Sequence, residues 1–304
     1  RGAPLIGFTA IAGLILDLNS KQYKNLDEFK QTCEYMKTAR PTAVNLMYEI
    51  DMSYKAIAAH VIEKGTWEGT ADLLMQKLID SMKKLESDNM TMAKLAEKRL
   101  EAIYGDKKLN LMTLCNTGFL ACGPMGTALG VISHMNAIGK VNHVYASETR
   151  PYMQGIRLTS WELMKENIKH EIVVEGAASH LMKSGKVDAV FIGADRIVSN
   201  GDTANKVGSS GLSIISNHYG VPFFVVAPFS SFDMSLDSGN QIEIEMRPED
   251  EILFCKGVRL APEGARAFNP SFDVTDHKLV TSIFCEKGEV HPVNRENMKT
   301  ILGE

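Results

Sequence analysis

Short apolar runs alternate with helix-length amphipathic segments over the last two thirds of this chain. The apolar runs cover residues 111–114, 141–145, 172–174, 189–192 and 223–227. The amphipathic segments between them cover residues 126–138, 152–167, 177–183 and 205–218. A regular alternation of strands and helices predicts an α/β fold, with a mostly parallel sheet and helices on both of its faces. The tail from about Gln241 is less regular, and we expect it to add an edge strand.

Residues 1–105 show a different pattern, which is typical of helices. Apolar side chains at helical spacing predict three helices, over residues 26–39, 42–64 and 66–104. Pro41 should end the first of them, because the residue before a proline avoids the α conformation. The polar residues 87–89 are where the third helix would be interrupted. We therefore expect a small helical domain over 1–105 and a second domain over 106–304, joined at a polar turn.

The composition is that of an ordinary globular protein, with 44% apolar and 23% charged residues among 304. The net charge of -4 gives no support for nucleic acid or an anionic membrane as partner. No apolar run approaches the ~20 residues that span a bilayer. The five cysteines form no C-x-x-C pair and the histidines show no metal-binding spacing, so we expect no metal site and a cytoplasmic location. The chain starts at Arg1 without an initiator methionine, and we expect further residues upstream.

Two reactive side chains stand where a strand-like run gives way to a glycine-containing turn. Cys115 follows the run at 111–114, and Asp195 follows the run at 189–192. Open α/β sheets bind ligands at the carboxyl ends of their strands. A helix N-terminus after Cys115 would lower the pKa of its thiol, although most free cysteines are simply buried. Asp195 is either a functional acid or a structural partner of Arg196. Together, Cys115 and Asp195 predict acid–base chemistry on a small molecule.

Other polar side chains follow the same predicted strands. Gln154 lies at helical spacing from two arginines, in a helix that Thr149 would cap. The alternative for this group is a solvated helix face. Lys206 would lie near the start of the helix over 205–218, where its charge opposes the helix dipole. That makes Lys206 a better candidate for an anion ligand than for a stabilising residue. The glycine turn at 123–128 could hold a phosphate, but such turns are as often structural.

Six segments of the chain resemble, in the same order, segments of the methylthioribose-1-phosphate isomerase family. They are RGAPLIG (1–7), RPTAVNL (40–46), ETRPYMQGIRLT (148–159), IGADRI (192–197), NGDTANKVG (200–208) and NPSFDVT (269–275). The resemblance implies an aldose–ketose isomerase of methionine salvage, which converts 5-methylthioribose 1-phosphate to 5-methylthioribulose 1-phosphate. It also implies a homodimer, a Rossmann-like domain after a small helical domain, and no metal or organic cofactor.

The resemblance implies roles for individual residues as well. Asp195 would donate a proton to the ring oxygen, and Cys115 would either shuttle the proton or stabilise the transition state. A dry pocket would favour both roles, because burial raises a carboxyl pKa and keeps the acid protonated near neutral pH. The positions that match the family's substrate-binding residues are Arg1, Gly2, Ala3, Arg40, Gln154, Asn205 and Lys206. The partner would be a small phosphorylated pentose, with arginine and lysine on its phosphate.

Four positions at three sites depart from the usual family pattern, namely Thr117, Met125 and the pair Glu175-Gly176. They follow predicted strands, near the expected pocket, and so leave open which group the sugar carries at C5. A 5-deoxyribose 1-phosphate isomerase is one alternative. Ribose 1,5-bisphosphate is another substrate to consider, although a second phosphate should require more basic residues. Outside the enzymes, the alternative is a non-catalytic regulatory subunit of the same fold, as in the eukaryotic translation-initiation exchange factor.

Overall fold

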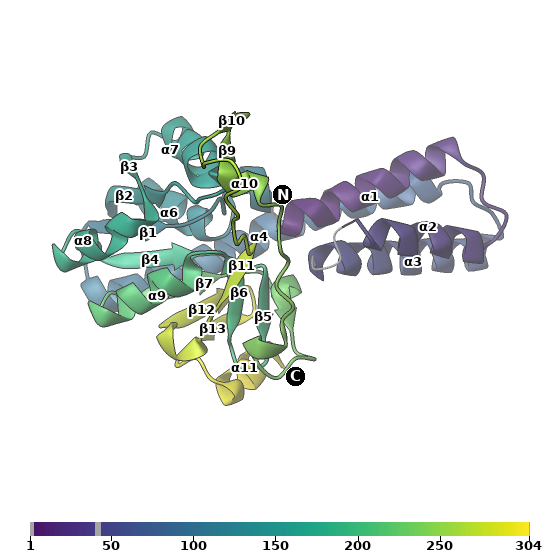
Figure 1. Cartoon of the computed structure of the whole chain (residues 1–304). Helices are drawn as coiled ribbons and strands as arrows, with labels where there is room; N and C mark the ends of the chain where they lie inside the picture. Colours follow the sequence, from purple (N-terminus) through teal and green to yellow (C-terminus); the bar gives the residue numbers. More distant parts are fainter. Residues whose placement is uncertain (1–2, 40–43, 304) are drawn as a thin grey trace.

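Four long helices open the chain in the computed structural model, which describes residues 3–39 and 44–303. They are α1 (Ala3–Ser20), α2 (Leu26–Lys37), α3 (Val44–Lys64) and α4 (Thr70–Tyr104). The first three and the beginning of α4 project away from the rest of the molecule (Figure 1). Phe29, Ile50 and Leu74 are among the side chains that form the core of this projecting part. The three predicted helices are thus confirmed as α2, α3 and α4, whereas α1 is a helix that the sequence analysis does not predict, and the helix end expected at Pro41 lies outside the described residues.

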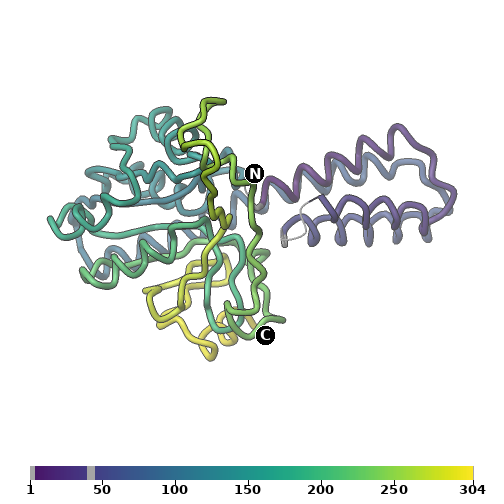
Figure 2. Tube along the Cα trace, viewed as in Figure 1, coloured from purple at the N-terminus to yellow at the C-terminus, as the bar shows by residue number. Residues whose placement is uncertain are grey.

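Helix α4 connects the projecting helices to the remainder of the chain, as its path in Figure 2 shows. Leu74 and Leu85 pack in the core of the projecting helices, whereas Met92 and Leu100 pack against the main sheet. The interruption predicted at 87–89 is wrong, because Asn89 is buried and finds a tertiary partner. Its side-chain amide donates a hydrogen bond to the Pro124 carbonyl at 2.7 Å. The domain boundary at 105/106 remains a prediction.

The centre of the molecule is a seven-stranded sheet with the order β13-β12-β7-β4-β1-β2-β3. Its strands are β1 (Leu109–Thr113), β2 (Val141–Ser147), β3 (His170–Val173), β4 (Ala189–Ile192), β7 (Phe223–Val226), β12 (Ser282–Cys285) and β13 (Gly288–Val290). All neighbours pair in parallel except β12 and β13. The mostly parallel sheet predicted from the five apolar runs is confirmed, and so is an edge strand from the tail.

Helices cover both faces of this sheet because its strands alternate their side chains between two cores. In β4, Val190 and Ile192 belong to one core and Phe191 to the other. The first face carries α8 (Ala178–Lys183), α9 (Ser209–His218) and α11 (Arg295–Leu302). The second carries the end of α4, α6 (Ala128–Ala137) and α7 (Ser160–Lys165). Strands buried on both faces read as continuous apolar runs, which is the pattern seen in the sequence.

A second sheet, with the order β11-β6-β5-β8, lies beside the carboxyl end of β4. Its strands are β5 (Arg196–Val198), β6 (Thr203–Lys206), β8 (Phe232–Asp233) and β11 (Phe272–Thr275). The helix predicted to start at Asn205 starts instead at Ser209. Asn205 and Lys206 belong to β6, because β11 pairs with them in antiparallel register. The helix-dipole interpretation of Lys206 is therefore wrong.

Short elements complete the chain. They are α5 (Phe119–Cys122), α10 (Asp250–Leu253), β9 (Phe254–Cys255), β10 (Val258–Arg259), the π-helical turn η1 (Gly155–Thr159), and the 3-10 turns η2 (Glu175–Ala177), η3 (Phe229–Ser231), η4 (Gly239–Gln241) and η5 (His277–Leu279). None of the helices in the described part of the chain is both long and apolar enough to cross a membrane.

Candidate active site

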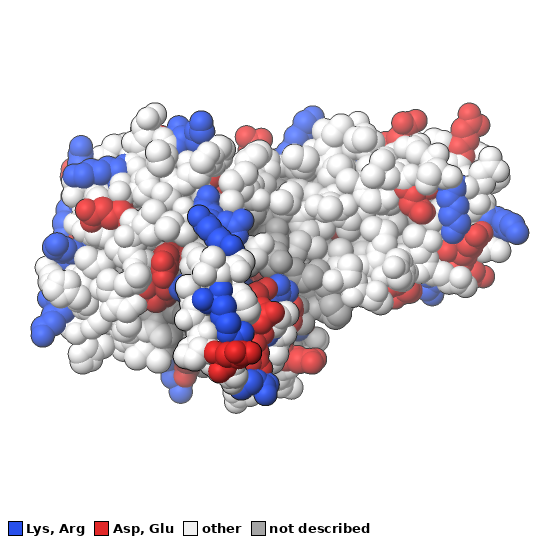
Figure 3. Space-filling view, turned by 45° about the horizontal axis from the view of Figure 1, so that its top comes forward, with Lys and Arg blue, Asp and Glu red and all other residues white. Residues whose placement is uncertain are grey.

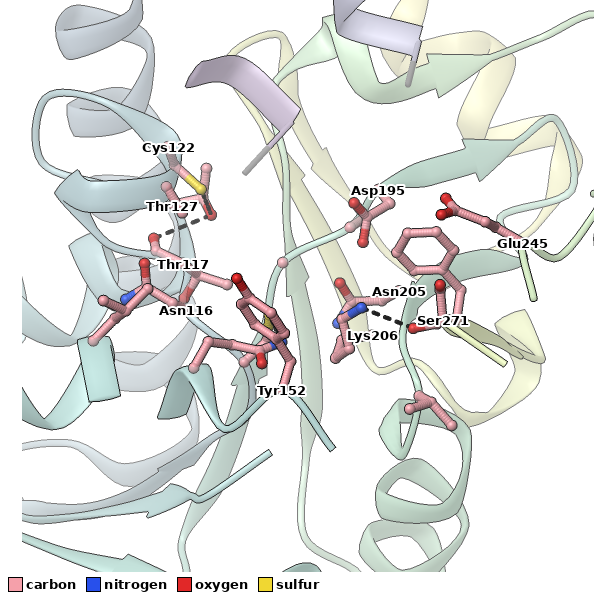
Figure 4. A pocket seen from close by; sticks show the side chains of 18 of the residues that line it. Asn116, Thr117, Cys122, Thr127, Tyr152, Asp195, Asn205, Lys206, Glu245 and Ser271 are labelled. Carbon is pink, nitrogen blue, oxygen red and sulfur yellow. Dashed lines mark hydrogen bonds between the residues drawn. The ribbon is translucent and has the colours of Figure 1, made fainter. Parts of the chain in front are cut away.

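A pocket at the carboxyl ends of β1 and β4 brings together the two reactive residues predicted from the sequence. Cys115 and Asp195 both line it, and so do Gln154, Asn205 and Lys206. Figure 4 shows Asp195, Asn205 and Lys206 on one side of this pocket and Asn116, Thr117 and Tyr152 on the other. The pocket is built from the loops after β1, β2 and β4 together with β6 and the segment before β11.

Cys115 follows β1 by two residues and is partly buried. Gln154 donates a hydrogen bond from Nε2 to the Cys115 sulfur at 3.2 Å. Burial raises the pKa of the Cys115 thiol, while the Lys206 ammonium and the Gln154 amide offset part of this effect. The predicted lowering of this pKa by a helix N-terminus is wrong. The helix α5 is only four residues long, and the Glu162 carboxylate already accepts a hydrogen bond from its first amide, Phe119 N, at 2.7 Å.

Asp195 lies in the bend that joins β4 to β5. Its backbone N–H donates to the Ala204 carbonyl at 3.0 Å, which ties the bend to β6. Its neighbour Arg196 forms an ion pair with Asp233 at 3.5 Å. The backbone is therefore fixed on both sides of Asp195, and its carboxylate faces the same space as Lys206 (Figure 4).

Asn205 and Lys206 reach the pocket from the end of β6. Lys206 donates from Nζ to the Ser271 carbonyl at 2.9 Å, and its ammonium lies 4.6 Å from the centre of the Phe272 ring. Asn205 donates from Nδ2 to Ser209 Oγ at 2.8 Å. These contacts orient both side chains without a ligand, and they leave a positive charge at the pocket wall that suits a phosphate.

The remaining substrate-binding residues expected from the resemblance are Arg1, Gly2, Ala3 and Arg40. Arg1, Gly2 and Arg40 lie outside the described residues. Ala3 is the first residue of α1, and the next residue, Pro4, lines the pocket. The start of α1 therefore reaches the same pocket as Cys115.

Four buried polar atoms at this pocket have no hydrogen-bond partner in the described structure. They are Asn116 Oδ1, Gln154 Oε1, Ser231 Oγ and Ser271 Oγ. An unpaired buried polar atom costs about 1–3 kcal/mol, so several at one pocket indicate a ligand with hydroxyl groups. The sequence analysis did not select Asn116, Ser231 or Ser271. Asn116 could have been found as the neighbour of Cys115, and Ser271 as part of the matching segment at 269–275, whereas nothing local distinguishes Ser231.

Other sequence candidates have structural roles. Thr149 does not cap a helix, because its φ is +64° and the next helical turn begins at Gly155. The glycine turn packs against the loop after β1, since a Cβ at Gly126 would lie 2.5 Å from Gly118 Cα. Arg157 lies on the surface and stacks over the Tyr152 ring at 5.3 Å, as a solvated helix face would.

One group of possible metal ligands occurs among the described residues, formed by Asp202, Asp276 and His277. The Asp202 oxygens already accept hydrogen bonds from two backbone amides, Gly239 N at 2.9 Å and His277 N at 3.0 Å. Asp276 accepts one from Lys278 N at 2.9 Å. This cluster is explained as a hydrogen-bonded anchor for the loops around β6.

Comparison with known proteins identifies the family and the relatives that this chain resembles. Residues 1–292 of this chain match the Initiation factor 2 subunit family. Methylthioribose-1-phosphate isomerases from Fervidobacterium nodosum and Thermotoga neapolitana are 41% and 42% identical, over 100% of this chain and 86% of each relative. The crystal structure of 5-methylthioribose 1-phosphate isomerase from Pyrococcus horikoshii superimposes with a TM-score of 0.89 at 36% identity, covering 100% of this chain and 84% of that one. The translation initiation factor eIF-2B subunit delta from A. fulgidus gives 0.84 at 31% identity, covering 100% and 87%.

Proposed function

Because the chain belongs to the Initiation factor 2 subunit family, we propose that it is the member that isomerises 5-methylthioribose 1-phosphate to 5-methylthioribulose 1-phosphate in methionine salvage. The observation that carries this proposal is the pocket in which a thiol, a carboxylate and a lysine meet four unpaired buried polar atoms. The likeness to relatives named methylthioribose-1-phosphate isomerase over the full chain supports the same substrate.

The chemistry requires an acid because the C1 oxygen of the sugar carries the phosphate. Ring opening to a free aldehyde is therefore blocked, and the ring oxygen must be protonated as its bond to C1 breaks. Asp195 donates this proton, a hydrogen moves from C2 to C1, and the C2 hydroxyl releases its proton back to Asp195 as the ketone forms. Cys115, which lines the same pocket, carries the proton or stabilises the transition state. Lys206 holds the phosphate, while Gln154 and Asn205 bond the sugar hydroxyls.

The proposed reaction requires neither a metal nor an organic cofactor. We propose the domain division at 105/106, with a Rossmann-like second domain, and a cytoplasmic location suited to a metabolic enzyme. On the face shown in Figure 3, basic side chains are interspersed with acidic ones. That arrangement favours a small-molecule partner over nucleic acid.

We also propose a homodimer that forms through the edge strand β3. Ile172 on this strand and Val174 just after it are exposed, and so are Trp161 and Met164 on α7, which packs beside β3. Exposed apolar side chains on neighbouring elements are typical of a protein interface. Met164→Glu together with Trp161→Glu should shift the protein to monomers in sedimentation analysis, and a dimer retained by this double variant would contradict the assigned interface.

The decisive test is an assay of the purified protein with three substrates in parallel: methylthioribose 1-phosphate, 5-deoxyribose 1-phosphate and ribose 1,5-bisphosphate. We expect the highest kcat/KM with the first. Preference for either of the others would reassign the group at C5. Turnover of none by the folded protein would favour a non-catalytic regulatory subunit, and the likeness to translation initiation factor eIF-2B subunit delta from A. fulgidus would then be the more informative one.

The assigned roles are tested by Cys115→Ser and Asp195→Asn. Each should nearly abolish isomerisation while leaving the circular dichroism spectrum and the melting temperature close to those of the parent protein. Turnover near the parent rate in either variant would remove the role assigned to that residue.

A further inference from the structure

The backbone at Cys115 is held from both sides in an unusual conformation. Its φ is +69°, in the left-handed region that residues other than glycine seldom adopt. Its N–H donates to Thr149 Oγ1 at 2.9 Å, and its carbonyl accepts from Thr159 Oγ1 at 2.6 Å. Hydroxyl groups from two other segments therefore fix the two peptide groups that orient the thiol in the pocket.

Thr149 is itself in a conformation that needs support. Its φ of +64° is a genuine outlier for a β-branched residue, and such strain persists only where the surroundings enforce it. Its N–H donates to Glu175 Oε1 at 2.6 Å, and its hydroxyl donates to the Ser147 carbonyl at 3.0 Å. Because a hydroxyl has one proton, donation to Ser147 leaves a lone pair for the N–H of Cys115. The donor and the acceptor are thus determined for each of the hydrogen bonds that link Glu175, Thr149 and Cys115.

These contacts join the ends of three adjacent strands in series. Cys115 follows β1, Thr149 follows β2 and Glu175 follows β3, and β1, β2 and β3 are neighbours in the sheet. Thr149 is only 1% exposed and lies behind Cys115. Neither Thr149 nor Glu175 belongs to the described residues that line the pocket. Their hydrogen bonds lead to Cys115, and neither side chain lines the pocket itself.

We infer that Thr149 and Glu175 are positioning residues, which set the orientation of the Cys115 thiol through the hydrogen-bonded series from β3 to β1. This inference rests on the proposed role of Cys115 in isomerisation.

The test compares kcat, KM and the alkylation rate of Cys115. Thr149→Val keeps the β-branched shape but removes the acceptor for the N–H of Cys115. We expect kcat to fall about tenfold, as for the loss of one ordinary hydrogen bond, with KM within about twofold of the parent value. The reaction of Cys115 with iodoacetamide, followed on its own peptide by mass spectrometry, should slow to a similar degree. Thr149→Ser should restore both.

Glu175 offers a second pair of variants. Glu175→Ala removes the acceptor for the N–H of Thr149, whereas Glu175→Gln keeps an acceptor oxygen without the charge. We expect Glu175→Ala to lower kcat and slow the alkylation of Cys115 in the same way as Thr149→Val. Glu175→Gln should retain more activity than Glu175→Ala, because the hydrogen bond and not the charge holds the loop.

Thr113→Val is the matched control. Thr113 is 1% exposed on β1, and its hydroxyl has no partner in the described structure, so its loss should change neither kcat nor alkylation. Unchanged values in Thr149→Val, or equal losses in Thr113→Val, would overturn the inference. If Thr149→Val does not fold, an equal effect of Glu175→Ala and Glu175→Gln overturns it instead. An active Cys115→Ser would remove the role of Cys115 in catalysis, while the alkylation rates would still decide whether Thr149 positions it.

Discussion

Asp202 anchors the hairpin that carries Lys206 into the pocket, and its loss should be costly. The residue lies between β5 and β6, and its carboxylate has four hydrogen-bond partners. Oδ1 accepts from His277 N at 3.0 Å and lies 2.7 Å from His277 Nδ1, while Oδ2 accepts from Gly239 N at 2.9 Å and Asn200 Nδ2 at 2.8 Å. In Asp202→Asn, an amide nitrogen replaces one of the two carboxylate oxygens. This nitrogen cannot accept hydrogen bonds, so the two groups that contacted the replaced oxygen lose their acceptor.

The expected loss follows from the number of contacts that are broken. A hydrogen bond to a charged group contributes about 1.5–3 kcal/mol, so two such losses should lower the free energy of unfolding by about 3–6 kcal/mol. Guanidinium denaturation at pH 7 measures this directly. Asp276→Asn is the matched control, because Asp276 is exposed and its carboxylate accepts one backbone hydrogen bond. A loss below about 1 kcal/mol in Asp202→Asn would refute the assignment of Asp202 as the anchor.

The same carboxylate predicts a dependence on pH. Burial alone would raise the pKa of Asp202, but hydrogen bonds from Gly239, Asn200 and His277 outweigh it and hold the pKa below its ordinary value of 3.8. A lowered pKa means that the ionised group favours the folded state, so its stabilisation is complete above the unfolded value and is lost as the pH falls through the folded one. The difference in unfolding free energy between the parent and Asp202→Asn should stay constant from pH 7 to 5 and shrink below about pH 4. A difference that grows in acid would show that the sign is wrong.

Two further substitutions test the pocket. Gly155→Ala should lower both the melting temperature and kcat, because a Cβ at Gly155 would lie 1.7 Å from the Ser147 carbonyl oxygen. Gly176→Ala, where a Cβ meets open space, is its control, and equal melting temperatures for the two would contradict this explanation. Gln154→Leu should raise the pKa of the Cys115 thiol, because it removes the donor that lies 3.2 Å from the sulfur. Alkylation of Cys115 at pH 7 should then slow by about tenfold, and an unchanged pH profile would show that Gln154 does not stabilise the thiolate.

The sequence predicts the main sheet well because each of the five predicted strands can be recognised from its own residues. Strands buried on both faces need continuous apolar runs, and the residues just after such runs, Cys115 and Asp195, necessarily reach the edge where the strands end. Lys206 shows where local information fails. It continues the strand β6 because Phe272, 66 positions later in the sequence, pairs with it. No pattern around Lys206 reveals that partner. Residues 203–208 contain few apolar side chains, and such a segment is equally compatible with the start of a helix.

The order of the strands explains why two residues 80 positions apart in the sequence share one pocket. From β1 the chain moves outward through β2 to β3, and it then returns to place β4 on the other side of β1. The helices that follow β1 and β4, α6 and α9, consequently lie on opposite faces of the sheet. Their separation leaves a crevice at the carboxyl ends of β1 and β4, the switch point at which open α/β sheets bind ligands. Cys115 follows the end of β1 and Asp195 follows the end of β4, the two strands that border this crevice. The topology therefore brings the thiol and the carboxylate to one pocket, and the hydrogen bonds of the neighbouring loops have only to set their orientation.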